Sequence, residues 1–329
     1  MKHVVIVGGG FAGVRVARRL HNVPGVKVTL ISDQTEFRYS PALYRTATGG
    51  LRRVSTIPVK TMISHLPDTE FVSARMTKIN REKRIITTTG GKNYHYDYAV
   101  LAIGVVTSYF NIPGLEQFSY SIKSAHEVER LKRHLHEQMT SREGPDKHYV
   151  IVGAGPTGVE LAAALGQYLK KIAKKHRIRR SRLAIELIEA ADRVLPTMAP
   201  GASRRAHAKL RRLGVKVMVG QKVEAATSNA LKVSGRMIPT HTVIWTAGVT
   251  NNPFFKRNNA QFELDKRGKV IVGKQLMIDQ HTYVIGDNAA IEFGGLAQTA
   301  IKHANFVAKH IARTVRYKHT SLSLSLIHI

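Results

Sequence analysis

The stretch Tyr149-Val-Ile-Val-Gly-Ala-Gly-Pro-Thr-Gly-Val-Glu-Leu-Ala-Ala-Ala-Leu165 decides the fold of this chain. Its pattern predicts a short buried strand, a glycine turn and the start of a helix. Gly153, Gly155 and Gly158 fit the G-x-G-x-x-G spacing. In that motif the first glycine permits a tight turn, the second lets the backbone approach a pyrophosphate, and the third lets the helix pack closely on the strand. The N–H groups at the helix N-terminus would bind the phosphates.

The chain opens with a second copy of this pattern, His3-Val-Val-Ile-Val-Gly-Gly-Gly-Phe-Ala-Gly13. Gly8, Gly10 and Gly13 occupy the three glycine positions. Two such units in one chain predict two dinucleotides bound face to face. The fold class that follows is α/β, with two Rossmann-like, three-layer dinucleotide-binding domains and the central domain inserted within the first.

An acid about 20 residues beyond the glycines normally binds a ribose hydroxyl in such a unit. Asp33 is the candidate in the first unit, although Ser32 stands where the acid would be expected, and Asp33 could instead be a turn former. In the central unit Glu189 ends the strand 183–189. Glu189 lies further from its glycines than the usual spacing of about 20 residues. We interpret the extra length of the intervening segment as an extension of the helix that follows the glycines. A carboxylate there favours NADH over NADPH; the alternative is a solvated strand end.

Three further apolar stretches, 95–104, 243–248 and 282–287, read as strands that end in small residues or an acid. An acid directly after a strand and a glycine, as at Asp287, suits the ribitol or pyrophosphate side of a cofactor. A helix predicted over Ala297–Val315 follows. Its N-terminus could stabilise negative charge on a reduced cofactor ring.

Other segments carry weaker patterns. The stretch Glu36–Gly49 mixes aromatics, a proline and arginines, and we expect an irregular loop there, either against a planar cofactor or on the surface. Strands at 71–73, 76–80 and 84–89 are expected to form one small meander. The segment 269–272 is predicted as a strand, and Ser124–Thr140 as an amphipathic helix.

Composition excludes several kinds of chemistry. The 329 residues contain no cysteine, so disulfides, Cys-ligated zinc, iron–sulfur clusters and a redox-active Cys pair are excluded. No signal peptide and no apolar run long enough to span a membrane are visible. The expected location is the cytoplasm or the cytoplasmic face of the cell membrane.

The chain is strongly basic, with 51 Lys+Arg against 22 Asp+Glu and a formal charge of +29. Much of this charge lies in the segment 170–182. We weigh a solvated helix end evenly against attraction to an anionic membrane surface. Nucleic acid is not the expected partner, because no zinc-finger or RNA-binding signature is present.

No metal site is predicted, because none of the 16 histidines shows a convincing ligand spacing. His303 is the one histidine that we single out for a catalytic role. The alternative is an ordinary histidine on the surface of a helix.

Taken together, the motifs resemble those of the type II NADH dehydrogenases, the NADH:quinone oxidoreductases of the two-dinucleotide flavoprotein superfamily. The resemblance extends from Met1 to about Tyr317. The motifs that carry it are Gly8-Gly-Gly-Phe-Ala-Gly13, Leu101-Ala-Ile-Gly104, Val152-Gly-Ala-Gly-Pro-Thr-Gly-Val-Glu-Leu-Ala162, Ile244-Trp-Thr-Ala-Gly248, Ile285-Gly-Asp287 and Leu296-Ala-Gln298.

The resemblance implies FAD at the first glycine motif and NADH at the central one. It implies a non-proton-pumping transfer of electrons to a membrane quinone, and possible homodimers. The FAD-binding residues would be Gly8, Gly10, Phe11, Ala12, Gly13, Asp33, Ala102, Gly104, Gly286, Asp287, Ala297 and Gln298. The NAD-binding residues would be Gly153, Gly155, Pro156, Thr157, Gly158, Glu160, Glu189, Ala247 and Gly248. The catalytic residues would be Glu160, Gln298, Lys302 and His303.

Residues 1–112 with 265–318 are expected to form the FAD-binding domain, and 113–264 the NADH-binding domain. Two departures from the family's pattern stand out. Lys302 and His303 occupy the place of paired glutamines near the quinone. We also expect the family's membrane-binding C-terminal region to be missing and the segment 319–329 to be a non-native tail; a genuine edge strand is the alternative.

Two other functions remain open at this point. One is a soluble FAD-dependent NAD(P)H reductase of a ferredoxin, a rubredoxin or a small acceptor. The other is a non-catalytic redox module that binds both nucleotides only as ligands. The fragment could also bind both nucleotides and yet be inactive with membrane quinone.

Overall fold

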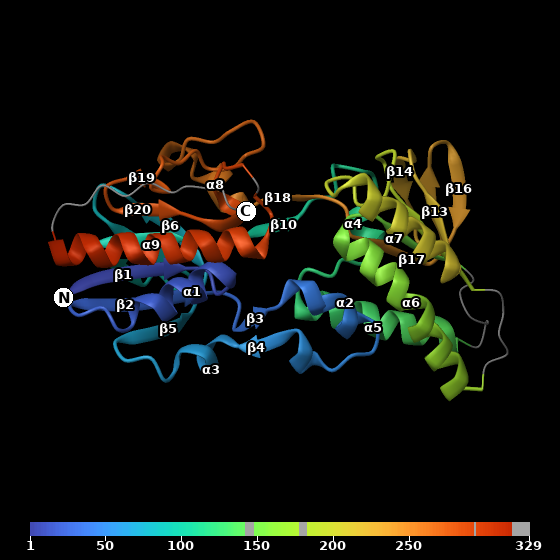
Figure 1. The fold of residues 1–329 in the computed structure, drawn as a ribbon, viewed down its shortest axis with the longest axis horizontal. Helices are drawn as coiled ribbons and strands as arrows, with labels where there is room; N and C mark the ends of the chain where they lie inside the picture. The colour runs from blue at the N-terminus through green and yellow to red at the C-terminus, as the bar shows by residue number, and fades with distance from the viewer. Residues whose placement is uncertain (142–147, 178–182, 293, 318–329) are drawn as a thin grey trace. The chain divides into compact units, whose positions relative to one another are not determined.

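The computed structural model describes residues 1–141, 148–177, 183–292 and 294–317 (Figure 1). By its internal contacts the chain divides into two compact units. The first unit comprises residues 1–37, 57–106 and 250–329, and the second comprises 38–56 and 107–249. The second unit is thus inserted into the first, as the sequence predicts.

The first unit contains a six-stranded sheet in the order β19-β20-β9-β1-β2-β5. Its strands are parallel except for β19, which runs antiparallel to β20. The strands are β1 (Lys2–Val7), β2 (Val26–Ser32), β5 (Thr69–Ser73), β9 (Tyr98–Leu101), β19 (Met277–Asp279) and β20 (Thr282–Val284). The helices of this unit are α1 (Phe11–Leu20), α3 (Val59–Ile63), α8 (Pro253–Arg257), η3 (Asn259–Gln261), η4 (Gly286–Asn288) and α9 (Ala297–Tyr317).

Helices cover one face of this sheet and a small antiparallel sheet covers the other. Side chains of β1 alternate between the two: Val4 and Ile6 pack toward α1 and α9, whereas Val5 and Val7 pack toward the antiparallel sheet. That sheet consists of β6 (Met76–Asn80), β7 (Ile85–Thr88) and β8 (Asn93–His95). Burial on both faces explains the continuous apolar run in β1.

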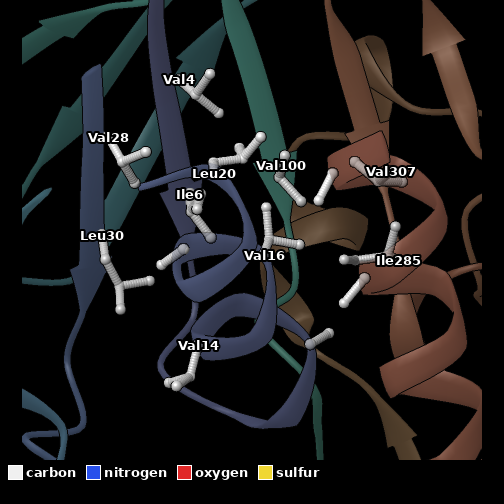
Figure 2. Close-up of a cluster of buried hydrophobic side chains, with 14 of the residues drawn as sticks. Val4, Ile6, Val14, Val16, Leu20, Val28, Leu30, Val100, Ile285 and Val307 are labelled. Atoms are coloured by element: carbon white, nitrogen blue, oxygen red, sulfur yellow. The ribbon is translucent and has the colours of Figure 1, made fainter. Parts of the chain in front are cut away.

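Two helices from opposite ends of the sequence close the core on the helical face. Figure 2 shows Val16 and Leu20 of α1, together with Val307 of α9, gathered over the central strands. All three side chains are fully buried. Each such side chain stabilises the fold by roughly 1.5–3 kcal/mol.

The second unit repeats this three-layer plan on a four-stranded parallel sheet, ordered β13-β12-β11-β17. The strands are β11 (His148–Val152), β12 (Ala184–Ile188), β13 (Val215–Met218) and β17 (Thr242–Trp245). The helices are η1 (Ser40–Ala42), α2 (Leu43–Ala47), η2 (Arg52–Val54), α4 (Leu115–Phe118), α5 (Ala125–Thr140), α6 (Pro156–Lys175) and α7 (Pro200–Arg212). The covering antiparallel sheet consists of β14 (Val223–Ala226), β15 (Ala230–Val233) and β16 (Arg236–Pro239).

Short paired strands lie where the chain crosses between the units. They are β3 (Glu36–Arg38) with β4 (Thr56–Pro58), and β10 (Val105–Thr107) with β18 (Val249–Asn251). The contact boundaries therefore lie near 106 and 250 and set 38–56 apart, whereas the sequence suggested boundaries at 112 and 265. Residues 38–56 group with the second unit because Leu43 and Ala47 of α2 are buried in its core.

Several expected elements need correction. The stretch Glu36–Gly49 contains the helix α2, because Leu43 and Ala47 share one buried face. Thr69–Ser73 is not part of the meander: it pairs with β2 as the edge strand of the parallel sheet. The segment 269–272 forms only an isolated bridge at Val270. The expected tail, 319–329, lies outside the described residues, as do 178–182 of the basic segment.

Other expectations are confirmed. The helix predicted over Ser124–Thr140 is α5, which begins after Ser124. The helix predicted over Ala297–Val315 is α9. The apolar stretch 95–104 includes β9 and ends in a turn at Gly104, whose φ is +70°.

Candidate dinucleotide sites

The N-terminal glycine turn joins β1 to α1 and has the form of a phosphate-binding loop. A Cβ atom on Gly8 would overlap the carbonyl group of Ala102, and one on Gly13 would overlap the carbonyl oxygen of Gly8. A Cβ atom on Gly10 would meet no atom within 4 Å. The first and third glycines are therefore needed for packing, and the middle glycine faces open space where a pyrophosphate can approach.

The central turn between β11 and α6 repeats these features. A Cβ atom on Gly153 would lie 2.6 Å from the Ala247 nitrogen, and one on Gly158 would overlap the carbonyl oxygen of Gly153. A Cβ atom on Gly155 would again meet nothing within 4 Å. Neither α1 nor α6 has an acidic residue in its first turn. Both helix N-termini can therefore hold an anion without repulsion from a neighbouring carboxylate.

A shared hydrogen-bond pattern relates the two turns residue by residue. The Gly8 N–H donates to the carbonyl oxygen of Ile31, and the Gly153 N–H donates to that of Ile188, each at 2.8 Å. The residue after each of these isoleucines is Ser32 in the first unit and Glu189 in the second. Ser32 is therefore the structural counterpart of Glu189, and Asp33 lies one residue beyond that position.

Glu189 is held against its glycine turn by two backbone groups. Its Oε2 accepts a hydrogen bond from the Ala154 N–H at 2.6 Å, and its Oε1 accepts one from the Ala191 N–H at 2.9 Å. This arrangement fixes a carboxylate at the end of β12, where a ribose hydroxyl would bind. It leaves lone pairs on both oxygens for a ligand.

Ser32 reproduces only part of this arrangement. Its Oγ accepts a hydrogen bond from the Gln34 N–H at 3.0 Å and lies close to Gly9. The Asp33 Oδ2 instead accepts a hydrogen bond from Arg75 at 2.8 Å, and both side chains are partly exposed. Asp33 remains a prediction as an FAD ligand, and the geometry favours Ser32 for the ribose side.

The acid at the end of β20 is tied to the loop before α9. The Asp287 Oδ1 accepts a hydrogen bond from the Gly295 N–H at 3.1 Å. Gly286 before it has a φ of +67°, a conformation that favours glycine. A Cβ atom there would lie 3.7 Å from Ala300 and 3.8 Å from Ala12. The structure therefore brings Ala12, Gly286 and Asp287 together with the first turns of α9.

Asn288 and Asn251 form a buried network that the sequence did not indicate. The Asn288 Oδ1 accepts a hydrogen bond from the Gly104 N–H at 2.8 Å, and its Nδ2 donates to the Gly104 carbonyl at 2.7 Å. The same Nδ2 donates to the Asn251 Oδ1 at 2.7 Å. This network fixes the small-residue turn at Gly104. Its signal in the sequence was only an amide residue directly after Asp287.

Thr246 has a similar supporting role in the second unit. Its hydroxyl lies 2.9 Å from the carbonyl oxygens of both Val152 and Gly153. It thereby ties the end of β17 to the central turn and sets Ala247 against Gly153. The aromatic ring of Phe110 lies against Gly248, where a Cβ atom would approach it at 2.5 Å.

Glu160 lies on the exposed side of α6, on the second turn. Partial burial of its carboxyl raises the pKa of Glu160, and the nearby Arg45 of α2 acts in the opposite direction. The structure thus places a cation, Arg45, near Glu160. From the sequence, Arg45 was expected only to lie in an irregular loop. A carboxyl whose pKa is raised by burial is a candidate for proton exchange at a functional site.

The remaining candidates lie on α9 and α1. Gln298 and Lys302 are exposed on α9, whereas His303 is fully buried. The alternative view of His303 as a surface histidine is therefore wrong. Phe11 packs edge-on against Phe37, with ring centroids 4.9 Å apart, so its ring belongs to the core of the first unit.

Two kinds of feature are absent from the described residues. Residues 1–141, 148–177, 183–292 and 294–317 contain no group of three His, Asp or Glu side chains arranged to hold a metal ion. Within the same ranges, every helix is too short or too polar to cross a membrane.

Comparison with known proteins identifies relatives of the whole chain. The family model for pyridine nucleotide-disulphide oxidoreductases matches residues 2–304. A type II NADH:quinone oxidoreductase of Mycobacterium tuberculosis is 30% identical over 94% of this chain and 72% of its own length. A type II NADH:quinone oxidoreductase of Staphylococcus saprophyticus is 26% identical, over 94% and 82% respectively.

Solved structures support the same fold. The NDH2 of Plasmodium falciparum in complex with NADH superposes with a TM-score of 0.81 at 20% identity and covers 88% of this chain. This chain spans 64% of that protein's length. The sulfide:quinone oxidoreductase of Aquifex aeolicus also gives a TM-score of 0.81, at 21% identity, with coverage of 96% of this chain and 77% of its own.

Proposed function

Because this chain belongs to the pyridine nucleotide-disulphide oxidoreductase family and, within it, to the type II NADH:quinone oxidoreductases, we propose that it transfers electrons from NADH through FAD to a quinone. The observation that carries the proposal is the pair of equivalent glycine turns. Each has an open middle glycine and a helix N-terminus without an acid, and Glu189 places a carboxylate beside the central turn.

The first unit fits the flavin nucleotide. Gly8, Gly10 and Gly13 would hold the pyrophosphate on the N-terminus of α1. Asp287, fixed by the Gly295 N–H, would accept hydrogen bonds from the polyol. Ala297 and Gln298 at the start of α9 would lie beside the ring system. FAD, when bound, supplies the acceptor of the hydride and the donor of electrons to the quinone.

The second unit fits NADH. Gly153, Gly155 and Gly158 would hold its pyrophosphate on the N-terminus of α6, with Pro156 and Thr157 in the same first turn. Glu189 would accept a hydrogen bond from a ribose hydroxyl and would repel the 2′-phosphate of NADPH. Ala247 and Gly248 would line the nicotinamide side. Glu160, with its raised pKa, would hold or release a proton there.

The proposed site for the quinone acceptor lies on α9. Lys302 is exposed on this helix and could donate a hydrogen bond to a quinone oxygen. His303 is buried and cannot contact a quinone at the surface of the unit. Of Lys302 and His303, Lys302 therefore remains the candidate for the acceptor site.

The proposed location is the cytoplasmic face of the cell membrane, where the quinone pool is accessible. The last two turns of α6 expose Lys170, Lys171, Lys174 and Lys175. Near an anionic membrane each cation contributes about 1 kcal/mol of attraction. Homodimer formation and the absence of nucleic-acid binding remain predictions from the sequence.

Anaerobic reduction of the FAD-loaded protein tests this function directly. Addition of NADH is expected to bleach the flavin absorbance rapidly, NADPH is expected to do so far more slowly, and a short-chain quinone should restore the absorbance. A flavin that stays oxidised with NADH would indicate a non-catalytic nucleotide-binding module. Reoxidation by a ferredoxin but not by quinones would indicate the alternative reductase.

A further inference from the structure

His303 lies in the second turn of α9, in the core of the first unit, with an exposed fraction of 0%. Its Nδ1 atom accepts a hydrogen bond from the Gly286 N–H at 3.2 Å. Gly286 begins the short helix η4 and precedes Asp287. The imidazole therefore holds the backbone of the turn that presents the candidate FAD-binding carboxylate.

The direction of this bond fixes the tautomer of the ring. A neutral imidazole has one acceptor and one donor nitrogen, so an accepting Nδ1 places the proton on Nε2. The Nε2 atom is buried and has no hydrogen-bond partner among the described residues. The side chain thus has an acceptor on one side and a donor on the other, as the amide of a glutamine would.

The turn that His303 holds is enclosed on two sides. Ala12 of α1 and Ala300 of α9 both lie within 3.8 Å of where a Cβ atom on Gly286 would be. The Asp287 carboxylate accepts a hydrogen bond from the Gly295 N–H, which lies shortly before α9. A shift of the Gly286 backbone would therefore move the Asp287 carboxylate and disturb its hydrogen bond with the Gly295 N–H.

We propose that His303 is a positioning residue for the flavin nucleotide: as a neutral acceptor for the Gly286 N–H, it sets the position of Asp287. This inference rests on the proposed function, because it assumes that Asp287 contacts FAD. His303 acts through Gly286 and Asp287, and electron transfer does not require it to exchange a proton.

The proposal requires an uncharged ring, because an imidazolium has two donors and cannot accept the Gly286 N–H. Burial lowers the pKa of His303 to about 4. The charged or titratable side chains on the packed elements are Arg15, Arg18 and Arg19 of α1, Asp287 of η4, and Lys302, Lys309, His310, Arg313 and Arg316 of α9 itself. Burial, rather than any of these charges, causes the shift.

The direction of the pH dependence follows from this lowered pKa. In the unfolded chain His303 takes up a proton near pH 6.5, whereas in the folded chain it does so only near pH 4. The stabilisation by the neutral ring is therefore present above about pH 6.5 and is lost as the pH falls toward 4. Loss of the Gly286 bond should accompany the protonation and weaken FAD binding.

The test compares His303→Gln with His303→Leu by titration of the apoprotein with FAD at pH 7.5, followed by fluorescence. Glutamine keeps an acceptor and a donor, so the FAD Kd should stay within about twofold of the wild type. Leucine keeps bulk but no acceptor, so the Kd should rise about tenfold. His310→Gln, at another buried histidine of α9, is the matched control and should leave the FAD Kd unchanged.

A wild-type FAD Kd in a folded His303→Leu variant would overturn the proposal. Below pH 5 the FAD Kd of the wild type should rise more steeply than that of His303→Gln, and parallel pH profiles would also contradict it. If His303→Leu fails to fold, the tautomer of His303 in the wild type provides the test. ¹⁵N NMR should show the Nε2–H form, and an Nδ1–H form would refute the hydrogen bond from the Gly286 N–H to Nδ1.

Failure of the proposed function is distinguishable from failure of this inference. A protein whose bound FAD is not reduced by NADH can still show the predicted order of FAD affinities. An apoprotein that binds no FAD at all would overturn both proposals.

Discussion

The carboxylate of Glu189 is fixed before any ligand arrives, because backbone N–H groups of Ala154 and Ala191 hold both of its oxygens. A preorganised acceptor loses little conformational freedom when a ribose binds. This makes Glu189 the residue on which the choice between NADH and NADPH should depend.

Replacement of Glu189 by alanine should weaken NADH binding about tenfold, because a hydrogen bond to a charged group contributes about 1.5–3 kcal/mol. NADPH should lose less, since the repulsion of its 2′-phosphate is removed as well. Stopped-flow flavin reduction across a range of NADH and NADPH concentrations measures both. The Asp192→Ala variant removes an exposed carboxylate three residues away and is the control. An unchanged ratio of the two reduction rates would refute the role of Glu189.

The first unit offers a contrast between two neighbouring residues. Ser32 lies against Gly9 of the glycine turn, whereas Asp33 pairs with Arg75 at the surface. We expect Ser32→Ala to weaken FAD binding by about threefold or more, since it releases the Gln34 N–H beside the turn. Asp33→Ala should change the FAD Kd by less than about twofold, because exposed ion pairs contribute little. FAD titration of both apoproteins checks this. A larger increase in the FAD Kd for Asp33→Ala than for Ser32→Ala would indicate that Asp33 binds the ribose.

At the residue scale the sequence indicates the glycines and Glu189 and misses the residues that support them. Glycine spacing is informative because each glycine has a steric reason visible in the motif itself. Thr246, Asn251 and Asn288 hold the turns through contacts with residues far away in the sequence. Asn288, for example, pairs with the backbone of Gly104. No local pattern contains such a contact.

At the scale of elements, helix α5 illustrates a local rule that works. The Ser124 hydroxyl accepts a hydrogen bond from the Glu127 N–H at 3.1 Å, and the Glu127 carboxylate accepts one from the Ser124 N–H at 2.7 Å. This capping box, followed by buried Val128, Leu131 and Leu135, fixes both the start of the helix and its inner face.

Removal of this cap should destabilise the second unit measurably. Ser124→Ala is expected to lower the free energy of unfolding by about 1 kcal/mol, because it leaves a helix N–H without its acceptor. Ser124→Gly should cost only a few tenths of a kcal/mol. Urea denaturation followed by circular dichroism gives both values. Equal losses for the two variants would mean that the hydroxyl does not cap the helix in solution.

Where the prediction of elements failed, packing between distant segments decided the outcome. Thr69–Ser73 carries the same β-branched signal as a meander strand, yet it pairs with β2 at the edge of the parallel sheet. Leu43 and Ala47 form a helix because α5 and α6 provide a partner for their apolar face. A window of a few residues contains neither of these partners.

At the scale of the whole molecule, the charge of +29 is a property that the sequence establishes by itself. The sequence alone does not give the distribution of this charge over the surface. The exposed lysines at the end of α6 are one concentration, and the exposed cations of α7 are another.

We expect the protein to bind vesicles that contain anionic lipid at low ionic strength and to be released in about 1 M salt, where the screening length falls to about 3 Å. Replacement of Lys170, Lys171, Lys174 and Lys175 by glutamine should weaken this binding strongly. The matched control replaces four exposed lysines of the first unit, Lys60, Lys78, Lys83 and Lys92. Cosedimentation that falls equally for both variants would mean that total charge, rather than the end of α6, governs adsorption.

The ribosome makes α1 well before α9, so the packing of α1 against α9 can form only late in synthesis. About 280 residues separate the two helices, which is roughly 15–55 seconds of synthesis at about 5–20 residues per second. Val16 and Leu20 have no covering helix throughout that interval, whereas all segments of the second unit, which ends at residue 249, are made before α9. Gly286, Asp287 and α9 are needed to complete the flavin site. The NADH-binding unit can therefore mature first, and we expect the loading of FAD to wait until α9 has been made.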